Sequence, residues 1–110
     1  MFETTFHHCA VGLAHVSPSG EFIRVNKTLS DFLGYDIEAF STLSIQEITA
    51  PSHLATDLNL LNKTLCGEID TYSLEKKYLH KEGHEVWGKL TVSLVRDKQG
   101  KPDYFISVVE

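Results

Sequence analysis

The stretch Gly83-His84-Glu85-Val86-Trp87 decides the fold, because it joins two extended runs of the chain. Apolar and polar residues alternate over Tyr72–His80 and again over Val86–Val95, which is typical of strands with one buried face. Lys81-Glu82-Gly83-His84 has the composition of a turn. We therefore predict a long β-hairpin with strands at 70–80 and 85–96.

Three further strands are predicted on either side of this hairpin. Residues 10–16 and 21–25 flank Ser17-Pro18-Ser19-Gly20, a turn in which proline fixes φ and glycine supplies positive φ. A second turn at 97–102 precedes a last strand at 103–110. The first two strands thus form a hairpin of their own, and the last three form a meander.

The middle of the chain has helical patterns. Asn26 is a candidate N-cap for a helix that ends at Gly34, and Asp36 and Ser44 are candidate caps of two short turns. The longest helix opens at Pro51-Ser52 and ends at Gly67. Its predicted buried stripe is Leu54, Leu58, Leu61 and Leu65, with Asp57 among the residues of the remaining surface. Two strands, helices and three strands indicate an α+β fold with helices on one face of an antiparallel sheet.

Composition limits the possible functions. The 110 residues make one domain, and the net charge of −5 with scattered basic residues argues against a nucleic-acid surface. The two cysteines are far apart, which fits a reducing compartment and gives no metal or redox motif. No apolar run approaches the ~20 residues of a membrane span. We expect a cytoplasmic domain without direct membrane contact.

Several short motifs together resemble the PAS domain family of sensor and dimerisation modules. They are Gly20-Glu21-Phe22-Ile23-Arg24-Val25-Asn26, Leu33-Gly34-Tyr35, Lys81-Glu82-Gly83 with Trp87, and Leu94-Val95-Arg96-Asp97. The resemblance covers nearly the whole chain. It implies a five-stranded antiparallel sheet in the order 2-1-5-4-3, with short helices and one long crossover helix on one face. Residues 1–8 would form a flanking helix and 9–110 the PAS core.

The family binds ligands, where it does so, between the sheet and the crossover helices. Strand parity predicts which side chains face this hollow, because alternate residues of a strand share a face. Gly88 would leave room for a ligand there. The predicted lining residues are Leu74, Lys76, Tyr78, Gly88, Leu90, Val92, Phe105, Ser107 and Val109.

Lys76 is the most informative residue of this set. A buried lysine is costly unless it is paired, so it would reach the rim, meet an anionic ligand such as a carboxylate, or pair within the domain. A pair with Asp57 or Glu47 is the favoured interpretation. Tyr78 could offer its hydroxyl to a ligand, although core packing is the commoner role of such a tyrosine.

Specific cofactors gain little support from the sequence. Flavin photochemistry in this family needs a cysteine in an Asn-Cys-Arg-Phe motif, and Ile45 in Ser44-Ile45-Gln46-Glu47 takes its place. Photoadduct formation is therefore excluded, and non-covalent flavin binding is unsupported. Haem-binding relatives use a histidine on the long helix. His53 is near that helix start, where a solvated or capping role is commoner.

The six histidines also raise the question of a metal. His7 and His8 are adjacent, a spacing that does not suit chelation from one helix face. His80 and His84 flank the hairpin turn and can approach each other, but the spacing indicates no carboxylate or thiol partner. We expect an exposed pair without metal.

The other face of the sheet predicts a homodimer contact. Trp87 and Val95 point away from the helices, and Phe2 and Phe6 lie four apart on the N-terminal helix. In the PAS family the outer face and this helix commonly form the dimer.

Function then follows from the resemblance. It implies a non-catalytic sensory or dimerisation domain that passes a signal to an effector, such as a histidine kinase or a cyclic-di-nucleotide enzyme. A ligand-free structural dimerisation module is the alternative. A small enzyme would need an acid-base pair, for example at His15, and the spacing indicates none.

Overall fold

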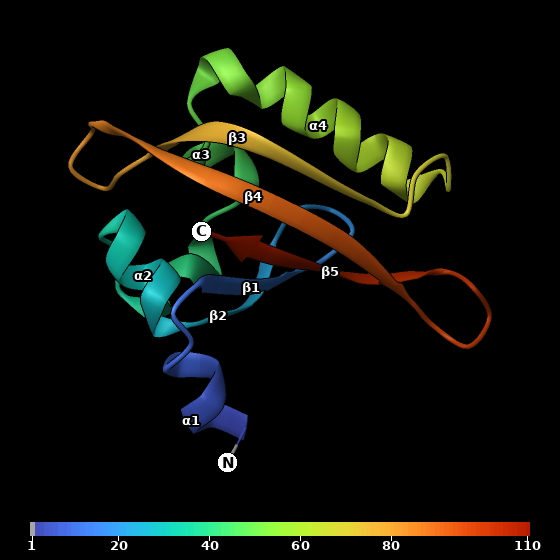
Figure 1. Cartoon of the computed structure of the whole chain (residues 1–110), viewed down its shortest axis with the longest axis horizontal. Coiled ribbons are helices and arrows are strands. Elements are labelled where there is room, and N and C mark those ends of the chain that lie inside the picture. Colours follow the sequence, from blue (N-terminus) through green and yellow to red (C-terminus); the bar gives the residue numbers. More distant parts are fainter. Residues whose placement is uncertain (1) are drawn as a thin grey trace.

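The computed structural model describes the backbone of residues 2–110 and the side chains of residues 5–110. Its centre is one five-stranded antiparallel sheet in the order β2-β1-β5-β4-β3 (Figure 1). The strands are β1 (Gly12–Val16), β2 (Phe22–Val25), β3 (Thr71–Leu79), β4 (Glu85–Arg96) and β5 (Pro102–Val109). The helices are α1 (Phe2–His7), α2 (Lys27–Leu33), the 3-10 helix η1 (Ile37–Thr42), α3 (Ile45–Ile48) and α4 (Pro51–Leu65).

The predicted fold class and strand order are confirmed. The boundaries of β4 match the prediction, whereas β1 begins at Gly12 rather than at residue 10. The reason for the late start is that the carbonyl oxygen of Val11 accepts a hydrogen bond from the side chain of Asn26 instead of from a neighbouring strand.

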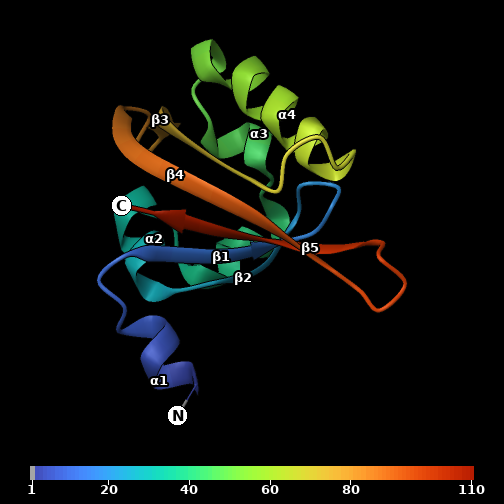
Figure 2. The same ribbon diagram turned by 45° about the vertical axis from the view of Figure 1, so that its right-hand side comes forward.

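The helices between β2 and β3 lie on one side of the sheet. In both views α4 runs beside β3 at one edge, and α2 lies near β1 at the other (Figures 1 and 2). α1 lies beyond β1 and β2, at the opposite end of the molecule from α4 (Figure 2). This arrangement places the core between the sheet and the helices α2, α3 and α4. No helix within residues 2–110 has the length and apolar character needed to cross a membrane.

Asn26 joins three elements and is fully buried. Its Oδ1 accepts from the backbone N–H of Leu29, which confirms the predicted N-cap of α2, and also from that of Leu13. Its Nδ2 donates to the carbonyl oxygens of Phe6 and Val11. One side chain therefore ties α1 and β1 to the start of α2.

The two short segments also begin where the caps were predicted. Asp36 precedes η1, but its side chain makes no capping hydrogen bond. Ser44 precedes α3, and Oε1 of Glu47 accepts from both its backbone N–H and its hydroxyl. Glu47 is thus engaged in capping and is not the partner of Lys76.

The predicted buried stripe of α4 is correct only in part, because Leu58 and Leu65 pack half-buried against the core while Asp57 and Thr64 also face it. Of its four leucines only Leu61 is buried, while Asp57, assigned to the surface, and Thr64 are each 1% exposed. Thr64 is accommodated because its hydroxyl donates to the carbonyl oxygen of Leu60. Asp57 is accommodated because it pairs with Lys76 of β3. A partner distant in sequence therefore determines which face of α4 turns inward.

Candidate functional site

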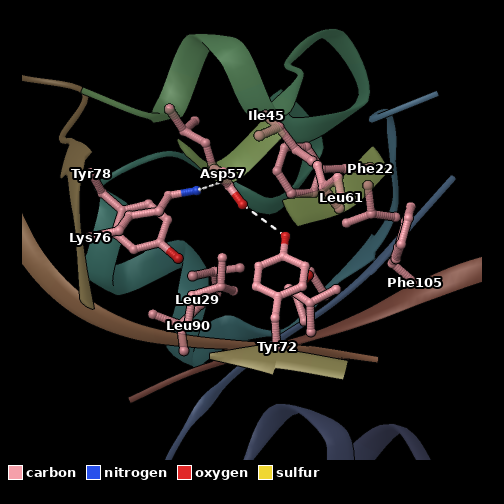
Figure 3. Close-up of a pocket in the computed structure, with 16 residues that line it drawn as sticks. Phe22, Leu29, Ile45, Asp57, Leu61, Tyr72, Lys76, Tyr78, Leu90 and Phe105 are labelled. Carbon is pink, nitrogen blue, oxygen red and sulfur yellow. Dashed lines mark hydrogen bonds and ion pairs between the residues drawn. The ribbon is translucent and has the colours of Figure 1, made fainter. Parts of the chain in front are cut away.

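A small cavity of about 30 Å³ lies in the core, between the inner face of the sheet and the helices (Figure 3). All five strands contribute to the sheet side, β2 through Phe22, and the helix side includes Leu29 of α2, Ile45 of α3 and Leu61 of α4. This volume holds one or two water molecules. Pockets for metabolite-sized ligands enclose about 300–1,000 Å³.

Most of the predicted lining residues border this cavity. They are Lys76, Tyr78, Leu90, Val92, Phe105, Ser107 and Val109. Parity was enough to find them because β3, β4 and β5 pair without interruption beside the cavity, with register shifts only near Arg96. Whether they bind a ligand remains a prediction.

Leu74 and Gly88 are not among the residues that line the cavity. Leu74 is half-buried and packs against the core. A Cβ atom added at Gly88 would lie 3.0 Å from Cε2 of Tyr78 and 3.1 Å from Cγ1 of Val109. The room predicted at Gly88 is therefore occupied by the Tyr78 ring.

A buried polar network forms one wall of the cavity. Lys76 Nζ lies 2.5 Å from Asp57 Oδ2, and the Tyr72 hydroxyl donates to Asp57 Oδ1 at 2.8 Å (Figure 3). The side chains of Lys76 and Asp57 are 2% and 1% exposed. The predicted intradomain pair of Lys76 with Asp57 is confirmed.

Burial removes water from the polar groups of Lys76 and Tyr72, and Asp57 interacts with both. Burial lowers the pKa of Lys76, and the nearby Asp57 carboxylate opposes that change. Burial also raises the pKa of Tyr72, and the charge of Asp57 raises it further. Asp57 therefore compensates for a buried ammonium and a buried hydroxyl at once.

Tyr78 contributes the one buried side-chain polar atom, among the described residues, that lacks a hydrogen-bond partner. Its side chain is 2% exposed and lines the cavity, and its hydroxyl points into the interior (Figure 3). Lys76 Nζ lies 4.6 Å from the centre of its ring. Burial raises the pKa of the Tyr78 hydroxyl, and the negative charge of Asp57 raises it further. The hydroxyl can thus donate to a small polar molecule in the cavity.

Sequence reasoning missed Tyr72, all of the helix-side lining residues, and the lining residues of the first two strands, which are Ala14, Val16 and Phe22. Tyr72 shares the parity of Lys76 and Tyr78, so the alternation of β3 already carried the signal. The helix side, which includes Leu29, Ile45 and Leu61, depends on how each helix packs, and the sequence pattern does not specify that.

The cofactor candidates do not fit the cavity. His53 does not line it, because its Nδ1 accepts from the Lys77 backbone N–H at 3.4 Å and its ring lies edge-on to Trp87, with 5.3 Å between centroids. Ile45, which stands in the place of the photoactive cysteine, does line it. A haem or flavin needs a far larger space than about 30 Å³.

The predicted dimer residues are spread over the outer face rather than gathered. Phe6 packs against Arg24, whose guanidinium carbon lies 3.9 Å from the ring centre, and against His15. Trp87 is 59% exposed and contacts His53 and Lys77, so it lies apart from Phe6 on this face. Phe2 lies outside the described side chains.

His15, the candidate for an enzyme reaction, lies on this outer face. Its ring is packed between those of Phe6 and Tyr104, at centroid distances of 6.0 and 5.0 Å. Burial, and then the charge of Arg24, lowers the pKa of its imidazole. The contacts are those of a packed aromatic group rather than of an acid-base pair.

The sheet order, the helices on one face and the core cavity between them define the architecture of an α+β domain. The model of the PAS fold matches residues 22–109, and the chain belongs to this family.

Two curated relatives match the chain nearly end to end. It is 42% identical over 109 residues to the probable diguanylate cyclase DgcE of Escherichia coli K12. That match covers 99% of this chain and 10% of the cyclase. The chain is 21% identical over 109 residues to the sensor histidine kinase TmoS of Ectopseudomonas mendocina, covering 99% of this chain and 11% of that one. The chain thus spans about a tenth of the length of each.

Among solved structures, the PAS domain of a protein from Colwellia psychrerythraea superposes with a TM-score of 0.88. The match covers 97% of this chain and 90% of that one, at 15% sequence identity. It shows a shared fold.

Proposed function

We propose that this chain is a non-catalytic regulatory domain of a longer, cytoplasmic signalling protein, and that its effector is a diguanylate cyclase. The observation that carries the proposal is the 42% identity to DgcE across 99% of the chain, twice the identity to the histidine kinase. The two free cysteines, Cys9 and Cys66, are consistent with a reducing compartment.

We infer that the domain acts as a homodimer through the outer face of the sheet. β1 and β5 pair there so that Leu13 lies opposite Val108, and Val95 of β4 lies opposite Tyr104. The outer patch, as we name these half-buried side chains, consists of Leu13, Val95, Tyr104, Ile106 and Val108.

This patch refines the predicted interface. Val95 belongs to it, whereas Trp87 is eight residues away along β4, a distance of about 26 Å at the rise of an extended strand. Lys89, Thr91 and Ser93 separate the two on the same face. We therefore assign the dimer contact to the outer patch together with Phe6, and leave Trp87 at its margin.

A substitution in the patch tests this proposal. Ile106→Glu puts a charge in its middle and should convert a dimer to a monomer in sedimentation velocity, with an unchanged far-UV circular dichroism spectrum. Asn59→Glu, at an exposed position of α4, is the control and should leave the mass unchanged. A monomer in the unsubstituted protein at high concentration would contradict the dimer.

A domain exchange tests the effector. This chain would replace the matching region of DgcE, and cyclic di-GMP synthesis would be measured with and without Ile106→Glu. We expect synthesis that depends on the outer patch. The regulatory role would be contradicted if cyclic di-GMP synthesis were equal in three proteins. These are the exchanged enzyme, its Ile106→Glu variant and the enzyme from which the region is deleted.

Binding of a small polar ligand is the second candidate function, and the unpartnered Tyr78 hydroxyl favours it. Because the cavity holds one or two waters, a larger ligand would have to displace side chains. Native mass spectrometry with an absorbance scan of freshly purified protein tests the idea. A bound mass that disappears in Tyr78→Phe supports it, and an unmodified chain mass in both proteins argues for the ligand-free module.

A further inference from the structure

The turn between β3 and β4 brings three metal-ligating side chains together. His80, Glu82 and His84 each offer one ligand atom, and these atoms all lie within 4.8 Å of one another. No other group of three such side chains is found among the described residues. We propose that this turn binds a zinc ion through the two imidazoles and the carboxylate, independently of the cavity and of any dimer.

The backbone of the hairpin fixes the two histidines side by side. The His80 N–H donates to the carbonyl oxygen of His84 at 2.9 Å, and the N–H of Gly83 donates to that of His80 at 2.8 Å. Residues that face each other across an antiparallel pair project to the same side of the hairpin. The rings accordingly stack, with 4.3 Å between centroids and an interplanar angle of 21°.

Glu82 is the ligand that sequence spacing did not reveal. It lies in the three-residue loop between the histidines, and the positive φ of 98° at Gly83 closes that loop. A closed loop keeps the carboxylate near the imidazoles, whereas an extended segment would carry it away.

The distances are compatible with zinc after small side-chain rotations. Zinc binds histidine nitrogen at about 2.0–2.1 Å and carboxylate oxygen at about 2.0–2.2 Å, so ligand atoms of one tetrahedral site lie roughly 3.4 Å apart. Glu82 and His84 are exposed and free to rotate by that amount. Binding also replaces the 3.1 Å hydrogen bond from the Glu82 N–H to His80 Nδ1, an exposed contact that is weak compared with a metal ligand.

The rest of the domain holds the turn in place. The Lys81 N–H donates to the carbonyl oxygen of Leu33 at 2.9 Å, which attaches the loop to the end of α2. A Cβ atom at Gly34 would lie only 2.6 Å from His80 Nε2, so the glycine lets the ring rest against the helix end. The site is therefore built on a fixed turn, and ordering it requires little loss of backbone freedom.

The ligand set points to zinc rather than to a hard cation. Two imidazoles and one carboxylate suit zinc, whereas calcium and magnesium prefer oxygen ligands throughout. Three protein ligands leave a fourth position for water.

Isothermal titration of zinc chloride into the untagged, chelator-treated protein tests the proposal. We expect one equivalent to bind, and His84→Ala and Glu82→Gln each to weaken binding, the first by about tenfold or more. His8→Ala removes an exposed histidine outside the cluster and serves as the matched control. Amide NMR spectra should show that zinc shifts residues 80–84 and the adjoining end of α2 in the unsubstituted protein.

Three results would overturn the site. They are the lack of saturable binding at millimolar zinc, equal affinity in His84→Ala and the unsubstituted protein, and a loss in His8→Ala as large as that in His84→Ala. Circular dichroism of each variant separates a lost ligand from a lost fold.

Discussion

Replacing Asp57 by asparagine should reveal how much the buried ion pair contributes to stability. The change removes the negative charge while keeping the size of the side chain and an oxygen that accepts from the Tyr72 hydroxyl. It leaves Lys76, which is 2% exposed, without a counter-charge. Removing one partner of a buried pair typically costs about 3–5 kcal/mol of unfolding free energy.

The possibility of deprotonating Lys76 sets an upper limit to this cost. A lysine with an unfolded pKa of about 10.4 can be made neutral at pH 7 for about 1.36 kcal/mol per pH unit, or roughly 4.6 kcal/mol over 3.4 units. In Asp57→Asn the folded state then holds a neutral amine while the unfolded state still binds the proton. Stability should therefore rise with pH, by up to about 1.36 kcal/mol per unit, until it levels off near pH 10.

Urea unfolding followed by circular dichroism between pH 7 and 10 measures both effects. The double variant Asp57→Asn with Lys76→Met contains no buried charge, so it should recover most of the lost stability and show no such rise relative to the unsubstituted protein. A cost of less than about 1 kcal/mol at pH 7 for Asp57→Asn would contradict a stabilising buried pair. The same holds if the stability of Asp57→Asn depends on pH no more than that of the double variant.

Three other substitutions test the packing around the site by the same unfolding measurement. Asn26→Ala removes the cap of α2 and three further hydrogen bonds, and should cost about 3 kcal/mol or more. Gly88→Ala should cost about 1–3 kcal/mol because its methyl group meets the Tyr78 ring, and Ser93→Ala, exposed on the same strand, should cost little. Tyr78→Phe should gain about 1 kcal/mol by removing an unpaired buried hydroxyl. It should also lessen the loss of stability above pH 10, where the unfolded phenol ionises while burial raises the pKa of the folded one. Unchanged curves for any of these variants would contradict the contact concerned.

The elements that sequence predicted well are those set by neighbouring residues. Alternation located β3 and β4, and the pairing of Asn26 with Gly34 located both ends of α2, because each signal acts within one turn or hairpin. The buried face of α4 was predicted only in part, because Asp57 also turns inward toward Lys76, 19 residues further along the chain. Helical periodicity assigns a carboxylate to the solvent face, because the pattern does not take account of a partner on another element.

The candidate site shows the same difference between features set by neighbouring residues and features set by distant ones. Parity found the cavity residues of β3, β4 and β5, since a strand fixes its own two faces. It did not reveal that the Tyr78 ring takes up the space at Gly88, since volumes on adjacent strands become comparable only when the register is known. Likewise, the Glu82 carboxylate lies near the two imidazoles because the loop is closed, and the spacing of residues in the sequence does not predict that shape.

β5 is shared by the cavity and the outer patch, so we expect it to couple the two. Phe105, Ser107 and Val109 border the cavity, and the intervening Ile106 and Val108 belong to the outer patch. A slip of one residue would exchange these two faces, so a change in the cavity cannot reach the patch by a shift of register. We therefore expect it to act by a tilt or translation of β5 relative to β1 and β4, which pair with it on both sides. If the proposed dimer forms through the outer patch, substitutions that enlarge the cavity, such as Phe105→Leu, should alter its affinity even though Phe105 lines the cavity and not the patch.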